Sequence, residues 1–117
     1  MGTPKLYEYR RPTRSWVRVI VRQCRELGHE IEVLREGEPD RGTVALCITQ
    51  REEGYSVITQ ARNADGHIFW IPVFGERQVA KAEAQDYLIR AVRRDPDLWI
   101  IEIESTNGRN LFPTALP

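Results

Sequence analysis

The spacing of apolar residues changes along this 117-residue chain, and that change limits the fold more than any other feature. From Trp16 to Leu27, apolar side chains recur every three or four residues, which is typical of one face of an α-helix. From Glu30 onward they recur every second residue, the period of a β-strand. Because Gly28 stands where the first pattern stops, we expect a helix that is capped by Ser15 and ends before this glycine.

Turn-forming residues divide the alternating part of the chain into four expected strands. Glycine, proline, asparagine and acidic residues gather at 36–42, 53–54 and 63–66. Pro72 in the last of the four cannot donate to a hydrogen-bond ladder, which favours a sheet edge or a bulge for that strand. The strands are expected from residue 30 to the turn at 36, and at residues 43–50, 55–62 and 67–74.

The remainder of the chain predicts a second helix and a fifth strand. Residues 78–94 carry apolar side chains on one helical face, and residues 98–104 alternate again after Asp95 and Pro96. The length suits one core. We therefore predict a single α+β domain over residues 15–112, in the order α-β-β-β-β-α-β, with an irregular arm at 1–14 and a tail at 113–117. We expect a predominantly antiparallel sheet with two helices packed on one face.

The fourth and fifth strands are apolar on both faces, which bears on partners. If both helices lie on one face, the other face needs a cover, which curling of the sheet, the chain termini or a second copy of the protein could provide. A homodimer is therefore one of three solutions. Its interface would use the aromatic side chains of Trp70, Phe74 and Trp99.

Apolar runs and cysteines indicate the compartment. No run approaches the roughly 20 apolar residues that span a bilayer, and the first residues lack the apolar core of a signal peptide. Cys24 and Cys47 both lie within apolar patterns, without the spacing of a zinc site or a disulfide framework. We expect a cytoplasmic protein that has no membrane segment and holds no metal.

The total charge is zero, but the charge is unevenly distributed. Residues 1–25 contain seven basic side chains and a single glutamate. Four arginines stack on one side of the first helix and could bind phosphates, as could Lys81, because residues 77–84 resemble the start of the last helix in double-stranded RNA-binding domains. Gln78 and Glu76 depart from that pattern. The alternative is a solvated helix face that downstream glutamates neutralise, and the balanced total favours it over nucleic-acid binding. The anion-binding candidates are Arg14, Arg18, Arg22, Arg25 and Lys81.

Three carboxylates near the last strand form a second candidate site. Glu102 and Glu104 lie two residues apart and so share one face of the strand, where with Asp97 they could bind a divalent metal in a small hydrolase. The same residues are also explained as charges that protect an exposed edge strand. The chain has no glycine-rich phosphate loop and no nucleophile beside a base, so we identify no catalytic residue and no cofactor.

Several segments resemble one bacterial family. The segment Asp95–Glu104 (DPDLWIIEIE), followed by Gly108 and Arg109, is the most specific, and Trp16–Arg18 and Val33–Glu38 add to it. Together they resemble the alphaproteobacterial domain-of-unknown-function family 1491, from about Trp16 to Phe112. The resemblance implies a bacterial cytoplasmic protein and carries over no activity. We expect a non-enzymatic interaction or regulatory module, with RNA or polyanion binding and metal-dependent hydrolysis as the alternatives.

Overall fold

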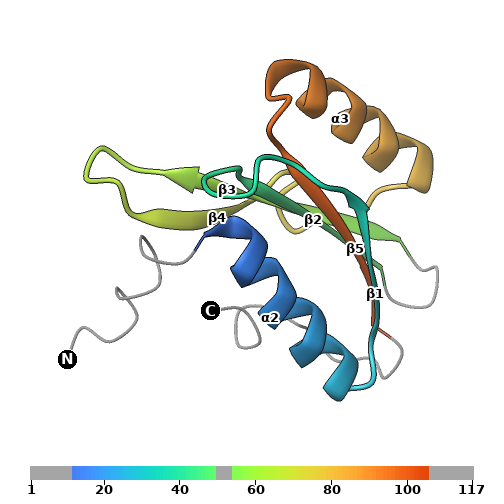
Figure 1. Cartoon of the computed structure of the whole chain (residues 1–117). Coiled ribbons are helices and arrows are strands. Elements are labelled where there is room, and N and C mark those ends of the chain that lie inside the picture. The colour runs from blue at the N-terminus through green and yellow to red at the C-terminus, as the bar shows by residue number, and fades with distance from the viewer. Residues whose placement is uncertain (1–11, 50–53, 106–117) are drawn as a thin grey trace.

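Two helices and five strands make up the described part of the chain (Figure 1). The computed structural model describes residues 12–49 and 54–105. The order is α-β-β-β-β-α-β, as predicted from the sequence. The elements are α2 (Thr13–Glu26), β1 (Glu30–Arg35), β2 (Val44–Thr49), β3 (Tyr55–Arg62), β4 (Ile68–Pro72), α3 (Lys81–Arg94) and β5 (Trp99–Glu104).

The strands form one mixed sheet in the order β1-β5-β2-β3-β4. β2 and β5 run parallel, and the other three neighbouring pairs are antiparallel, which confirms the predominantly antiparallel sheet. Pro72 lies in β4, an edge strand, as its missing N–H predicts. The interpretation of Glu102 and Glu104 as guards of an edge strand is wrong, because β5 pairs with β1 on one side and β2 on the other.

The two helices cover opposite faces of the sheet, so the expectation that both pack on one face is wrong (Figure 1). Alternation in the central strands explains the arrangement. In β5, Ile101 and Ile103 face α2, whereas Ile100 faces α3. With apolar side chains on both faces, the sheet needs a helix on each, and the result is three layers. A second copy is therefore not required to cover a bare face.

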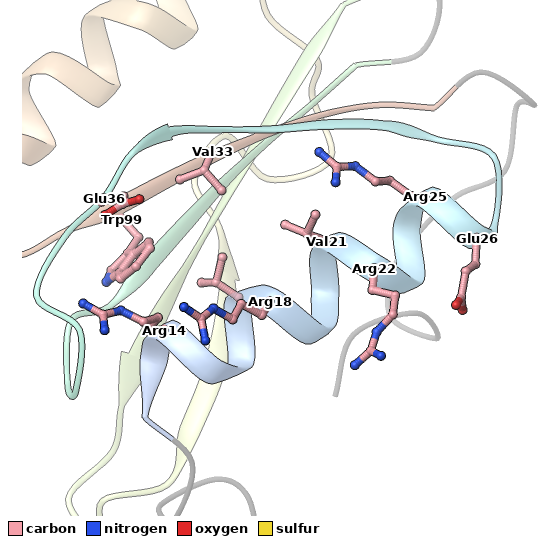
Figure 2. A pocket seen from close by; sticks show the side chains of 10 residues that line it. Arg14, Arg18, Val21, Arg22, Arg25, Glu26, Val33, Glu36 and Trp99 are labelled. Atoms are coloured by element: carbon pink, nitrogen blue, oxygen red, sulfur yellow. The ribbon is translucent and has the colours of Figure 1, made fainter.

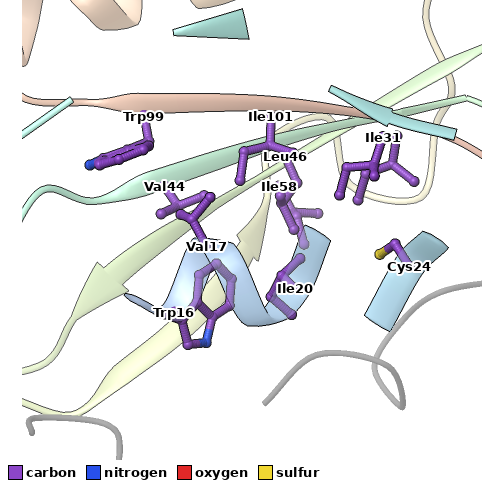
Figure 3. Packing of buried hydrophobic residues seen from close by; sticks show 11 residues of the cluster. Trp16, Val17, Ile20, Cys24, Ile31, Val44, Leu46, Ile58, Trp99 and Ile101 are labelled. Atoms are coloured by element: carbon purple, nitrogen blue, oxygen red, sulfur yellow. The ribbon is translucent and has the colours of Figure 1, made fainter. Parts of the chain in front are cut away.

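The α2 side holds the larger core cluster (Figure 3). Ile20 of α2 and Leu46, Ile101 and Ile103 of the sheet are fully buried there. The α3 cluster draws smaller side chains from its helix, Ala84 and Ala91 among them. Cys24 belongs to the α2 cluster and Cys47 to the α3 cluster, so the sheet separates the two buried free thiols.

Both helices begin at points that distant residues determine. α2 starts at Thr13, not after a Ser15 cap, because the backbone N–H groups of Thr13 and Arg14 donate to the carbonyls of Asp40 and Pro39 at 3.2 and 2.8 Å. α3 starts at Lys81 and not at residue 78, because Val79 and Tyr55 exchange two backbone hydrogen bonds of 2.9 Å in a β-bridge.

Most of the expected arm and all of the expected tail fall outside the described residues. Residues 1–11 of the expected arm and the expected tail, 113–117, lie outside the described residues, whereas residues 13 and 14 belong to α2. Neither helix in the described ranges is long and apolar enough to cross a bilayer.

Candidate binding groove between α2 and β1

A groove of about 550 Å³ runs between α2 and the sheet edge formed by β1 (Figure 2). All four arginines of the predicted stripe line it, together with apolar residues of the helix and the sheet and one glutamate near each end. The lining residues are Arg14, Val17, Arg18, Val21, Arg22, Arg25, Glu26, Val33, Glu36 and Trp99.

Helical spacing places three of the arginines on the groove side. Residues 14, 18 and 25 differ by four and seven positions, so their side chains stack along one face of α2. Figure 2 shows Arg14 and Arg18 directed toward Trp99, and Arg25 directed toward β1. Arg22 lies on the neighbouring stripe and points away from β1, at the outer rim.

The floor of the groove is apolar. Val17 is buried, and Val21 and Val33 are half-buried where the helix meets β1. The Trp99 side chain is 3% exposed, and its Nε1–H donates a 2.8 Å hydrogen bond to the carbonyl oxygen of Glu38. The floor therefore offers aliphatic contact surface, and the polar atom of its one aromatic residue is already satisfied.

The groove arginines have no carboxylate partner within the described ranges. The one ion pair found there joins Arg77 to Glu83, 3.3 Å apart on the surface beside α3. Glu26 and Glu36 line the groove without forming a salt bridge to a guanidinium group. The interpretation that glutamates neutralise the stripe therefore has no ion pair to support it here, and the groove carries a net positive charge.

Most backbone donors in the first turn of α2 are already engaged. The N–H groups of Thr13 and Arg14 donate to loop carbonyls, and that of Trp16 donates to Pro12. A helix N-terminus attracts anions through donors that have no partner, and three of the first four are taken here. Anion binding in the groove therefore depends mainly on side chains.

Lys81 is remote from the four arginines, because it begins α3 on the opposite face of the sheet. It lies close enough to Cys47 to act on that thiol. Burial, and after it the charge of Glu102, raise the pKa of Cys47 to about 11, against the opposing charge of Lys81. The structure thus brings four of the five anion-binding candidates together.

The three candidate carboxylates are not gathered at one point. Glu104 lies five residues, about 16 Å, from the first residue of β5, and Asp97 precedes that residue. Across the sheet, Glu102 is paired with Glu32, and Glu104 with Glu30, in the antiparallel register. In the described ranges, no group of three or more histidine, cysteine or acidic side chains is placed to hold a metal ion.

The aromatic residues assigned to an interface pack within the molecule. Trp99 belongs to the α2 core cluster. The ring of Trp70 packs against Trp16 with centroids 5.7 Å apart, and the ring of Phe74 meets Tyr87 edge-on at 5.9 Å. Each ring therefore has an internal contact, and Trp99 offers almost no exposed surface to a partner.

Sequence reasoning missed the sheet side of the groove. The sequence predicts Val33 only as an apolar strand residue, Trp99 as an aromatic residue of a dimer interface, and Glu36 as part of a turn. Their place opposite the arginines depends on β5 pairing with β1 and on α2 crossing that edge. The one local signal was Val21, which falls between Arg18 and Arg25 on the same helical face and marks a stripe that is only partly polar.

Comparisons with known proteins agree on one family. A family model described as "Protein of unknown function (DUF1491)" matches residues 12–113. A crystal structure of a DUF1491 family protein from Caulobacter crescentus is 31% identical, covers 84% of this chain and 91% of that one, and has a TM-score of 0.72. An NMR structure of a DUF1491 family protein from the same species is 32% identical over 80% and 84% of the two chains, with a TM-score of 0.70.

A solution structure of a protein from A. tumefaciens shares the fold at lower identity. It is 19% identical, covers 92% of this chain and 94% of that one, and has a TM-score of 0.74. No curated protein matches the chain.

Proposed function

This chain belongs to the DUF1491 family of proteins of unknown function, and from that premise we propose that it is a non-enzymatic interaction module that binds an anionic partner in the groove between α2 and β1. The observation that carries the proposal is a set of groove arginines that have no carboxylate partner among the described residues. Arg14, Arg18 and Arg25 point into a groove with an apolar floor, and none of them forms an ion pair in the described ranges.

The charge arrangement supports binding over mere solvation. An exposed helix face gains little from clustered like charges, since each added guanidinium group repels its neighbours at four-residue spacing. An anionic partner removes that repulsion and adds charge-assisted hydrogen bonds. Binding of an anionic partner therefore lowers the electrostatic free energy of the groove, whereas in the empty groove the repulsion between guanidinium groups remains.

The hydrolase alternative has less support from the geometry. Asp97 and Glu104 lie near opposite ends of β5, and the nearest neighbours of Glu102 and Glu104 across β1 are further glutamates. Carboxylates arranged in cross-strand pairs give an acidic surface. A hydrolase would instead need a nucleophile and a base within reach of one substrate atom. We propose no reaction for them.

Polyanion titrations test the proposal. Fluorescence anisotropy of labelled poly-glutamate, polyphosphate and single-stranded RNA is measured at 50 mM salt against the native protein and against Arg14→Glu/Arg18→Glu. We expect at least one probe to bind, with affinity that falls with added salt and falls at least tenfold in the double variant. The control is Arg90→Glu/Arg93→Glu on α3, which changes the net charge equally on the other face.

Two results would refute binding in the groove. One is that none of the three probes binds at low salt. The other is that the α2 and α3 charge reversals weaken binding equally, since that would mean attraction to overall charge rather than to the groove.

The assembly state and the compartment belong to the same proposal. With a helix on each sheet face, the exposed large apolar side chains of the described residues are spread over several elements; they are Leu27, Leu34, Phe69, Ile71 and Ile89, each between 42% and 53% exposed. We propose that the module acts as a monomer in the cytoplasm, where two buried free thiols remain reduced. Light scattering at micromolar concentration tests the first point, and a dimer would refute it.

A further inference from the structure

We infer that the occupant of the groove between α2 and β1 is an extended protein segment in which acidic and apolar residues alternate. The inference rests on the proposed function and specifies its partner. Three properties of the groove carry it: its length, its side-chain spacing and its lack of a stacking surface.

The length of the groove suits an extended chain. From Arg14 to Arg25 the helix rises about 16 Å, at about 1.5 Å per residue. An extended segment covers that length in about five residues, at about 3.3 Å each. A small anion would reach only one or two of the arginines, whereas such a segment passes all of them.

The spacing of the lining residues matches the repeat of a strand. Arg14 and Arg18 lie four residues apart, a rise of about 6 Å, and so do Val17 and Val21. In an extended chain, side chains on the same side recur every two residues, about 6.6 Å. The side chains on one side of an extended partner can therefore place carboxylates beside the arginines, while the side chains on its other side cover the valines.

The lining disfavours nucleic acid. Single-stranded RNA gains much of its binding energy from bases that stack on exposed aromatic rings. Trp99 is the aromatic residue of the lining, and its side chain is 3% exposed. Glu36 near Arg14 and Glu26 beside Arg25 also repel a chain that carries a phosphate at every step, whereas a peptide can present an uncharged or basic residue at those points.

A pair of peptides with the same composition tests the inference. One is a labelled nine-residue peptide of alternating glutamate and valine, and the other contains the same residues in two blocks. Anisotropy is measured for both against the native protein, Arg14→Glu/Arg18→Glu and Arg90→Glu/Arg93→Glu. We expect the alternating peptide to bind at least tenfold more tightly than the block peptide, and to lose at least tenfold in affinity in the α2 variant alone.

Backbone amide chemical shifts locate the bound peptide. We expect changes in α2 and β1 and none along α3. A single-stranded RNA or polyphosphate that binds the groove while the alternating peptide does not would overturn this inference and leave the proposed function standing. Equal binding of the two peptides would also overturn it. If no probe binds and charge reversal has no effect, both proposals are wrong.

Discussion

The indole Nε1–H of Trp99 donates a 2.8 Å hydrogen bond to the backbone carbonyl of Glu38, and this bond joins the first residue of β5 to the loop between β1 and β2. The same loop accepts the first N–H groups of α2 through Pro39 and Asp40. Together with the hydrogen bond from the Glu38 N–H to the Asp97 carbonyl, Trp99 thus holds the loop that positions the start of the helix, and with it the Arg14 end of the groove.

Replacing Trp99 by phenylalanine should lower the free energy of unfolding by about 1–2 kcal/mol, because the part-buried Glu38 carbonyl loses one of its two donors and keeps only the Gly42 N–H. Urea denaturation followed by circular dichroism measures the change. Trp70→Phe is the matched control, because Trp70 is half-buried and packs on Trp16 by ring contact. Equal losses in the two variants would contradict the role given to the hydrogen bond.

Gly37→Ala should destabilise the folded protein more than the addition of a single methyl group suggests. A Cβ at this position would overlap the backbone carbonyl of Asp97, where the chain leaves α3 for β5. Since neither backbone can move freely, we expect a loss of about 3 kcal/mol. Gly28→Ala is the control: its Cβ meets open space, and its φ of +88° costs only about 1–2 kcal/mol. Thermal denaturation of both variants gives the comparison, and a Gly37 variant as stable as the Gly28 variant would refute the close approach.

Local features of the sequence determined most of the strands. β3 begins and ends where predicted, because Gly54 and the turn after Arg62 bound an alternating run. The starts of the helices were displaced by two or three residues because their determinants are remote: Asp40 for α2, and the bridge between Tyr55 and Val79 for α3. No local pattern encodes such pairings.

The groove was predictable only on its helical side. The spacing of Arg14, Arg18 and Arg25 follows from the helix period, and the sequence alone reveals it. The opposite wall could be predicted only from the strand order, in which β5 lies between β1 and β2. In that order Val33 of β1 lines the groove beside the helix. In the same topology α3 covers the second face of the sheet. The apolar residues on both sides of β5 are consistent with this arrangement, because each face then needs a helix.

Glu32→Lys should stabilise the protein by about 0.5–1 kcal/mol. Glu32 and Glu102 are directly opposite in the antiparallel register, as are Glu30 and Glu104, and like charges in such positions repel. The substitution turns one repulsive pair into an attractive one. The measurement is the urea midpoint at low salt and at 1 M salt, where screening should remove most of the gain. A gain that persists in high salt would exclude an electrostatic cause.

Alkaline pH should destabilise the protein through Cys47. Burial, with the charge of Glu102, raises the pKa of this thiol from its ordinary value of 9.0 to about 11, against the opposing effect of Lys81. Between pH 9 and 11 the unfolded chain releases this proton while the folded chain keeps it, so the contribution of Cys47 to stability is complete below pH 9 and declines above it. The decline amounts to about 2–3 kcal/mol by pH 11.

Cys47→Ala isolates that contribution, because all other alkaline titrations, including that of buried Cys24, remain in both proteins. We expect the native protein to be the more stable of the two at pH 8, since alanine leaves space in the α3 core. As the pH rises from 9 to 11, the difference between their free energies of unfolding should shrink by about 2–3 kcal/mol. Urea denaturation at each pH measures it. A constant difference would mean that Cys47 ionises at the same pH in the folded and unfolded chains, and that α3 does not shield the thiol from water.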